Sequence, residues 1–348
     1  MAKTLVVIVT HNSQQSGYLV DCLRSLRASL FVEAFDLCIV DNASTDDTIL
    51  TVERQWPEAV IIKNAQNEGF AVANNQGFGY AIKHDYEFVF ILNHDTVVEK
   101  SFLQAAIRGI GSNPKVAAVQ SKLLLFDDKS KINSIGNEIH FLGFAYAGGH
   151  GTPDRQLPLT EITYPSGAAT LFRVSALETV GFFNGEFFMY HEDTDLGWRL
   201  WLAGYRILLA PESVVYHKYQ FSKSIKKFYY MERNRRLVVF QNYRLKTLLL
   251  IFPAGIAVAV AMLAYSLFSG WFVENLKVYW YFLHPNSWIK VIRTRRAVQK
   301  KRTVADREII PRFVDRIEFQ DVTSPVTRFL LNPFTQAYWF LIKPLIRW

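Results

Sequence analysis

The alternation of short β-branched runs with helical patterns in the first quarter of the chain constrains the fold most. Runs of strand length and segments of helical periodicity follow one another at residues 5–9, 18–30, 37–40, 60–62, 70–82 and 88–92. A further helix is expected after Ser44, which stands as an N-cap with Asp47 three residues on. Alternation of this kind predicts an α/β fold with a mostly parallel central sheet and helices on both faces.

Polar side chains follow three of the predicted strands where each strand ends. These residues are Thr10-His-Asn12, Asp41-Asn42-Ala-Ser44 and Asn93-His-Asp95. Ligands of parallel sheets bind beyond the carboxyl ends of the strands. We therefore expect these three groups to contribute to one site.

Three carboxylates lie within four residues in the second half of the predicted catalytic part. Glu192, Asp193 and Asp195 stand between the aromatic run 187–190 and a predicted helix over 191–204. Carboxylates clustered beside apolar rings cost free energy, unless they bind a ligand or one of them takes part in proton transfer. The simpler alternative is an acidic first turn of a helix. Asp195 also precedes Arg199 by four residues, a spacing that favours a supporting ion pair.

Length, cysteine usage and the N-terminus limit the remaining possibilities. A chain of 348 residues predicts two domains, which we place at 1–222 and 223–348. Cys22 and Cys38 have no metal-site spacing and are expected to be buried, as in a reducing compartment. The apolar run at 5–9 is too short for a signal peptide, so we expect the catalytic part to be cytosolic.

The C-terminal part has the composition of a membrane-associating region. Residues 247–273 are nearly all apolar and carry no charge, while basic residues gather on both sides, in the predicted helix 224–243 and at 290–302. The length suits a spanning or re-entrant helix; a helix lying in the interface and a buried hairpin are the alternatives. The net charge of +8 fits an anionic membrane surface, and we expect no nucleic-acid partner.

Several segments together resemble the inverting family 2 glycosyltransferases, and within them a rhamnosyltransferase-like branch. The segments are Thr10-His-Asn12, Val40-Asp-Asn-Ala-Ser44, Asn67-Glu-Gly-Phe-Ala71, Asn74-Asn75, Leu92-Asn-His-Asp95, Gly167–Arg173 and Glu192-Asp-Thr-Asp-Leu196. The resemblance covers roughly residues 3–245. It implies a GT-A fold, which is Rossmann-like, a nucleotide-diphosphate sugar as donor and a divalent cation.

The resemblance gives most of these polar residues a role in holding the donor. Asp41 is expected to accept from the N3–H of the base, and Thr10 and Asn12 to bond the base or the ribose. Gly69 permits close approach of a phosphate or ribose at the start of the third helix. The full set expected at the nucleotide sugar is Thr10, Asn12, Asp41, Asn42, Ser44, Asn67, Gly69, Phe70, Asn74 and Asn93.

The resemblance also implies a site for Mg²⁺ or Mn²⁺. Asp95 stands at the acidic position of the family's metal motif, and a carboxylate suits either ion. His217 matches a family histidine that completes the metal shell, with a structural role as its alternative. His94 stands where this branch often has proline, and we expect it to face solvent or to support the ligands. Arg173 is expected to pair either with phosphate or in a structural salt bridge.

Asp193 is the predicted general base, since an inverting transfer needs one carboxylate to take the acceptor's proton. Glu192 is expected to orient the acceptor or a metal-bound water. The leading interpretation is an enzyme that moves a sugar, L-rhamnose from dTDP in the first instance, to a lipid-linked or cell-surface glycan. UDP and GDP sugars would use much the same residues. We place it at the cytoplasmic face of the membrane, peripheral or with a single insertion.

Three other functions agree less well with the sequence. A processive polysaccharide synthase usually has several long apolar helices and a Gln-x-x-Arg-Trp motif, which this sequence lacks. A non-catalytic scaffold or nucleic-acid binder on a transferase fold disagrees with the intact set of carboxylates. A dinucleotide-dependent dehydrogenase is excluded because no Gly-x-Gly-x-x-Gly follows the first strand.

Overall fold

The computed structural model describes residues 3–30, 35–219, 228–318 and 327–348. The chain forms two compact units. The first comprises Met1–Asn137, Ala147–Leu200 and Tyr205–Tyr219, and the second comprises Glu138–Tyr146, Trp201–Gly204 and Gln220–Trp348. The division predicted at residue 222 stays a prediction.

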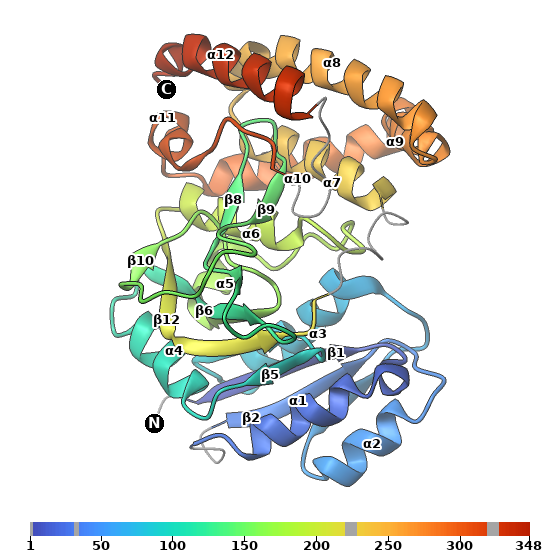
Figure 1. Ribbon diagram of the computed structural model, residues 1–348, viewed down its shortest axis with the longest axis vertical. Helices are drawn as coiled ribbons and strands as arrows, with labels where there is room; N and C mark the ends of the chain where they lie inside the picture. Colours follow the sequence, from blue (N-terminus) through green and yellow to red (C-terminus); the bar gives the residue numbers. More distant parts are fainter. Residues whose placement is uncertain (1–2, 31–34, 220–227, 319–326) are drawn as a thin grey trace. The chain divides into compact units, whose positions relative to one another are not determined.

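A ten-stranded sheet forms the centre of the first unit (Figure 1). Its main path runs β10-β12-β6-β11-β4-β1-β2-β3, with β5 paired to β12 and β7 paired to β6. The strands are β1 (Thr4–Thr10), β2 (Phe35–Asp41), β3 (Val60–Lys63), β4 (Phe88–Leu92), β5 (Thr96–Val98), β6 (Val116–Leu125), β7 (Ile132–Ser134), β10 (Thr160–Glu161), β11 (Ala169–Arg173) and β12 (Arg206–His217). The predicted α/β class is confirmed.

The sheet combines a parallel part with antiparallel additions. Strands β1, β2, β3 and β4 pair in parallel, as their alternation with helices requires. Strand β11 pairs antiparallel with both β4 and β6, and β5, β7 and β10 also pair antiparallel. Among the described elements, no helix stands between β6 and β11 in the chain, so no crossover connection requires these strands to pair in parallel.

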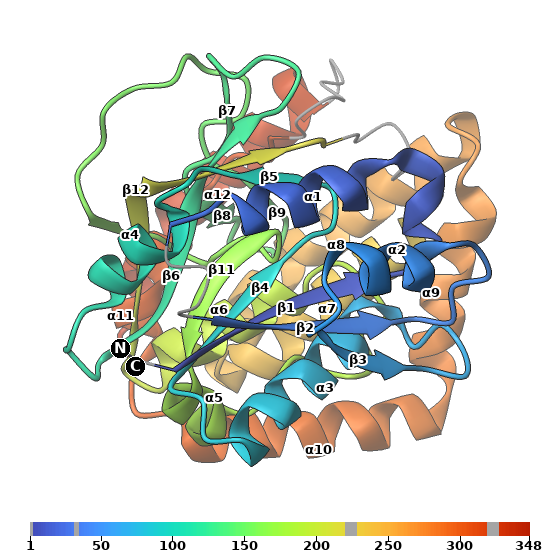
Figure 2. The same ribbon diagram turned by 90° about the horizontal axis from the view of Figure 1, so that it is seen from below.

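Helices cover both faces of this sheet, as predicted. They are α1 (Tyr18–Arg27), α2 (Thr48–Gln55), α3 (Gly69–Lys83), α4 (Phe102–Ile110), α5 (Val174–Val180) and α6 (Glu192–Leu202), preceded by a short turn of 3₁₀ helix at Ser13–Ser16. Figure 2 shows α1 and α2 on one face of β1–β3 and α3 on the other. Side chains alternate accordingly: Val6 and Ile8 join the cluster that contains Leu23 of α1, whereas Val7 lies against Gly77 of α3.

Helix α2 begins later than the sequence suggested, and Ser44 is not its N-cap. The Ser44 hydroxyl donates instead to the carboxylate of Asp41 (2.5 Å). The backbone N–H of Thr48 donates instead to the side chain of Asp46 (3.1 Å). Ser44 thus belongs to the hydrogen-bonded loop at the end of β2, where the candidate site lies.

The second unit is mainly helical. Its elements are a small sheet of β8 (Asn137–Ile139) and β9 (Ala145–Ala147), followed by α7 (Phe228–Asn242), α8 (Leu245–Phe268), α9 (Phe272–Leu283), α10 (Pro285–Lys301), α11 (Asp306–Ile309) and α12 (Asn332–Ile342), with short helical turns at Ile310–Arg312, Thr327–Leu331 and Lys343–Leu345. Part of the predicted helix 224–243 lies outside the described residues. Among those described, α8 alone is long and apolar enough to cross a membrane, judged by length and composition.

Candidate active site

The carboxyl ends of β1 and β2 bring Thr10, Asp41 and Ser44 together. Asp41 is buried, and its Oδ1 accepts from the hydroxyls of Thr10 (2.9 Å) and Ser44 (2.5 Å). Its Oδ2 accepts from the backbone N–H of Ser44 (3.0 Å). A carboxylate held by three donors is fixed in position, as a group that reads a ligand must be.

Asn12 and Asn42 complete this end of the sheet. Asn12 adopts the left-handed conformation (φ 49°), and its side chain accepts from the backbone N–H of Thr45 (2.8 Å). The Asn42 amide donates to the carbonyl of Gly69 (3.2 Å) and so joins β2 to the start of α3. The two predicted donor-binding segments are thereby neighbours.

The start of α3 is shaped by a glycine that no other residue can replace without strain. Gly69 has φ +81°, and a Cβ there would lie 2.4 Å from the carbonyl oxygen of Phe188. The side chain of Asn67 caps its backbone N–H (2.9 Å). Asn74 is buried, and its amide donates to the carbonyl of Phe70 (2.9 Å), so this side chain braces the first turn of the helix.

The residues just before β11 connect Asp193 to the same edge of the sheet. The backbone N–H of Asn93, at the end of β4, donates to the carbonyl of Ala168 (2.9 Å). The adjoining Gly167 N–H donates to Asp193 Oδ2 (3.1 Å). A Cβ on Gly167 would lie 3.2 Å from the ring of Phe70 and 3.8 Å from Asp193, so the glycine keeps space between ring and carboxylate.

Asp193 and Glu192 differ in how their charges are supported. Asp193 Oδ1 accepts from the Thr194 N–H (2.7 Å), whereas Glu192 Oε2 is buried without a hydrogen-bond partner. Burial and then the charge of Asp193 raise the pKa of Glu192 well above its usual range. Burial also raises the pKa of Asp193, although hydrogen bonds from Gly167 and Thr194 oppose this. The hydrogen bonds therefore favour the ionised form of Asp193, whereas Glu192 Oε2 has no such support.

The backbone immediately before these carboxylates is strained. Tyr190 and His191 both have φ 67°, a left-handed conformation that is uncommon for such residues. The carbonyl of His191 then accepts from the Asp195 N–H (2.9 Å) at the first turn of α6. Strain of this kind collects at functional sites; the sequence contained no signal for it.

Asp95 and His217 form the candidate metal position. Oδ1 of Asp95 is buried without a hydrogen-bond partner and lies 3.3 Å from Nε2 of His217. The other ring nitrogen of His217 lies 2.9 Å from Oδ1 of Asn133, an arrangement that assigns the proton to Nδ1. Nε2 of His217 and Oδ1 of Asp95 thus face each other, and both atoms are of a type that can bind one cation.

The residues fit a divalent cation that takes its remaining ligands from a diphosphate and water. Within the described part of the chain, no three His, Cys, Asp or Glu side chains converge on one point. Burial raises the pKa of Asp95, but the nearby charge of His217 outweighs it, so the net shift is downward. Burial lowers the pKa of the adjacent His94. Sequence reasoning missed Asn133, because nothing in the chain marks an asparagine that orients a histidine 84 residues away.

Two polar residues named from the sequence have structural partners. Arg173 donates to the carbonyls of Val116 (3.2 Å) and Gly111 (2.8 Å), so the structural alternative holds for it. Arg199 forms the predicted ion pair with Asp195 (2.8 Å), and both are buried. This pair fastens α6, whose first turn carries Glu192 and Asp193.

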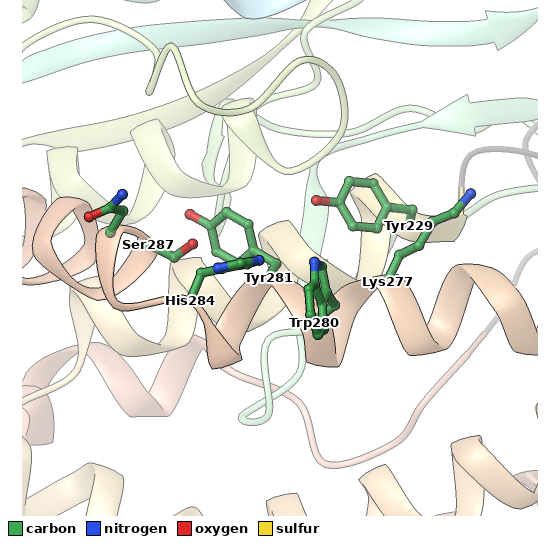
Figure 3. Close-up of a pocket in the computed structure, with 7 residues that line it drawn as sticks. Tyr229, Lys277, Trp280, Tyr281, His284 and Ser287 are labelled. Atoms are coloured by element: carbon green, nitrogen blue, oxygen red, sulfur yellow. The ribbon is translucent and has the colours of Figure 1, made fainter.

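A separate pocket of about 390 Å³ is found within the second unit (Figure 3). Its lining residues are Tyr229, Lys277, Trp280, Tyr281, His284, Asn286 and Ser287. None of the residues predicted for the donor, the metal or catalysis is among them. We therefore place the candidate active site at the edge of the sheet where β1, β2 and β4 end, beside Asp193 and the Asp95–His217 pair.

Thr194→Val provides a test of the electrostatics around Asp193. The Thr194 hydroxyl lies 3.4 Å from Asp193 Oδ1 and helps to keep its pKa down. A base must be ionised to act, so activity is lost as pH falls through its pKa in the folded protein. Removal of the hydroxyl raises that pKa, and we expect the acid limb of the pH–kcat/KM profile to move to higher pH. An unmoved acid limb would contradict Asp193 as the base.

Comparison with known proteins identifies the family of the chain. A family model described as "Glycosyl transferase family 2" matches residues 5–181, slightly more than half of the chain. A comparison with curated proteins finds none that matches.

Solved structures show the same fold at low sequence identity. The structure of GalNAc-T7 with UDP, GalNAc and Mn²⁺ is 14% identical in sequence, with a TM-score of 0.58. The match covers 74% of this chain and 51% of that one. The chain thus spans about half the length of that protein. A mannosyltransferase from Pyrobaculum calidifontis in complex with GDP-Man and Mn²⁺ is 16% identical, TM-score 0.51, with 86% of each chain covered. S. aureus TarS 1–349 in complex with UDP is 17% identical, TM-score 0.51, covering 97% of this chain and 87% of that one.

Proposed function

Because the chain belongs to glycosyltransferase family 2 and is a glycosyltransferase, we propose that it transfers a sugar in a single displacement that inverts the configuration of the anomeric carbon. In this proposal Asp193 is the general base. The observation that carries the proposal is the support of Asp193. Two backbone N–H groups, those of Gly167 and Thr194, hold its carboxylate at 3.1 and 2.7 Å. Glu192 beside it, whose Oε2 is buried without a hydrogen-bond partner, is suited to orient the acceptor.

The donor is a nucleotide-diphosphate sugar, with dTDP-L-rhamnose as the first candidate. Asp41 is suited to accept from the base, and the edge formed by Thr10, Asn12 and Gly69 to hold base, ribose and diphosphate. The identity of the sugar rests on the resemblance to the rhamnosyltransferase-like branch. The solved relatives contain UDP or GDP-Man, so UDP and GDP sugars belong in the same test.

Asp95 and His217 would hold a divalent cation at the diphosphate. Bound there, the cation supplies neutralisation of the charge that develops on the leaving diphosphate. Mn²⁺ accompanies the nucleotide in two of the solved relatives. Asp95 contributes a hard oxygen ligand and His217 an imidazole nitrogen, and Asn133 fixes the orientation of that ring.

The acceptor that we propose is a lipid-linked or cell-surface glycan, met at the cytoplasmic face of the cell membrane. The support for it is compositional: an apolar helix, α8, beside segments rich in basic and aromatic residues. An acceptor anchored in lipid would present its sugar to the site while its lipid stays in the bilayer.

Release of nucleoside diphosphate from a panel of dTDP, UDP and GDP sugars tests the function. The assay combines the full chain, Mn²⁺ and a lipid extract that contains polyprenyl-linked saccharides. We expect one donor, dTDP-L-rhamnose first, to be consumed and a single sugar to be added to a lipid-linked product. No release from any donor would favour a non-catalytic scaffold, and a ladder of long products would favour a processive synthase.

Asn133→Leu is expected to weaken Mn²⁺ binding by about 10- to 100-fold, since outer partners of metal-bound histidines have effects of this size. The leucine removes the acceptor that holds His217 Nδ1–H without emptying the site. Asn133→Asp restores an acceptor and is expected to restore most of the affinity. Mn²⁺ titration followed by thermal stability in the presence of nucleotide measures both. Equal affinity in all three proteins would exclude His217 as a ligand.

A further inference from the structure

One face of helix α8 is packed within the second unit and the opposite face is bare. The buried residues are Thr247, Ile251, Ala254, Val258 and Ser266, at the spacing of a single helical stripe. The exposed side carries large apolar residues, namely Leu249, Phe252, Ile256, Val260, Leu267 and Phe268. Each of these is between 48% and 89% exposed, which is unusual for a helix of a soluble unit.

Helix α12 extends this bare surface. Figure 1 shows α12 beside α8, and the Tyr338 hydroxyl of α12 donates to the carbonyl of Leu250 (2.7 Å). Phe340 and Leu341 of α12 are 80% and 67% exposed. We call the exposed apolar residues of α8 and α12 the apolar platform.

Polar contacts fasten α8 to the unit at both of its ends. At the start, Asp306 accepts from the backbone N–H of Arg244 (3.0 Å) and from the Thr247 hydroxyl (2.5 Å). Near the other end, the Asn275 amide of α9 donates to the Ser266 hydroxyl (3.3 Å), and both side chains are buried. A helix that crossed the bilayer would have to leave these partners or carry them into the hydrocarbon.

The neighbours of α8 are too short to cross with it. Helix α9 has 12 residues and α12 has 11. At about 1.5 Å per residue they rise less than 20 Å, against about 30 Å of hydrocarbon. Helix α9 also carries the ion pair Glu274–Lys277 (2.9 Å), which would be costly inside a bilayer.

The charges beside the apolar platform match an anionic surface. Lys246 lies over the ring of Trp348 (5.3 Å) and Lys343 over that of Trp339 (5.9 Å), so basic and aromatic groups border the apolar residues. Residues 327–348 contain Arg328, Lys343 and Arg347 and no acidic residue. Basic groups near such a surface strengthen its attraction to anionic lipids.

We propose that the apolar platform docks in the headgroup region of an anionic bilayer, with α8 lying in the membrane plane and not crossing it. This deepens the proposed membrane location and does not depend on the donor or the acceptor. The apolar side chains enter the boundary between headgroups and acyl chains, while the packed face of α8 stays with the protein.

Labelled cysteines separate docking from crossing. Cys22 and Cys38 are both buried, so a thiol-reactive fluorophore reports Leu245→Cys, Val260→Cys and Phe268→Cys introduced singly into the full chain. With vesicles that contain phosphatidylglycerol, we expect all three labels to have a similar shallow depth by lipid-phase quenchers. An external impermeant reductant should bleach all three. Protection of one end of α8 and a central depth for residue 260 would overturn the proposal.

A charge-introducing variant tests the surface itself. Phe252→Glu with Phe340→Glu is expected to lower partitioning onto these vesicles by at least about tenfold, given the transfer energies of exposed aromatic residues. Leu50→Glu is the matched control, since Leu50 is an exposed apolar residue of α2 in the first unit, and it should partition like wild type. Equal partitioning of all three proteins would overturn the proposal, as would a stable dimer that buries the apolar platform and leaves the wild type off the vesicles. Nucleoside diphosphate release by the same variants shows separately whether the proposed function fails.

Discussion

Asp193→Asn is expected to reduce kcat by about 10³-fold and to leave nucleotide affinity nearly unchanged, because general-base catalysis contributes about 10²–10⁴. An asparagine has nearly the same size and keeps one oxygen, which can accept from one of the two N–H groups that now donate to Oδ1 and Oδ2, so most of the local fold should persist. What it lacks is the ability to take the acceptor's proton. Nucleoside diphosphate release, measured together with nucleotide binding, checks both parts.

Asp195→Asn, the same change two residues further along, is the control. Asp195 is buried against Arg199, and loss of one partner of a buried pair costs about 3 kcal/mol or more of stability. We therefore expect its melting temperature to fall while kcat of the folded enzyme changes little. If Asp195→Asn lost as much turnover as Asp193→Asn, or if Asp193→Asn stayed active, the assignment of the base would be wrong.

Asp95→Asn is expected to remove the dependence of nucleotide binding on Mn²⁺ and to lower kcat by about 10²–10³-fold. Asparagine keeps the size of the side chain but loses the anionic oxygen, and the leaving diphosphate then lacks its counter-charge. Nucleotide titrations with Mn²⁺ and with a chelator measure the effect.

Asp128→Asn removes the same charge at another position and is the control for Asp95→Asn. Asp128 pairs with the exposed Lys131 (3.0 Å), outside the candidate site. Exposed pairs of this kind contribute little, so metal dependence and turnover should match wild type. If nucleotide binding by Asp95→Asn depended on Mn²⁺ as strongly as in wild type, Asp95 would not be a ligand of the cation.

The sequence was most informative where a single physical rule decides the structure. The parallel arrangement of β1, β2, β3 and β4 follows from their alternation with helices, and the polar residues at their ends consequently share one edge. The ion pair between Asp195 and Arg199 follows from helical spacing alone.

The sequence was least informative where partners are distant in the chain or local rules compete. Asn133 and His217 meet only because β7 pairs with β6 and β6 with β12. Serine is a residue type that is common at N-caps, but the hydroxyl of Ser44 donates to the Asp41 carboxylate instead. The antiparallel insertion of β11 depends on pairing at both of its edges, for which no local pattern exists.

Thermal unfolding of the full chain with dTDP, UDP or GDP, each with Mn²⁺ or with a chelator, tests most directly the claim of a metal-dependent nucleotide site at the edge of the sheet. We predict that one nucleotide, dTDP first, raises the melting temperature only when Mn²⁺ is present, and that Asp95→Asn loses this response. No shift with any nucleotide, in a protein that melts cooperatively, would contradict the account.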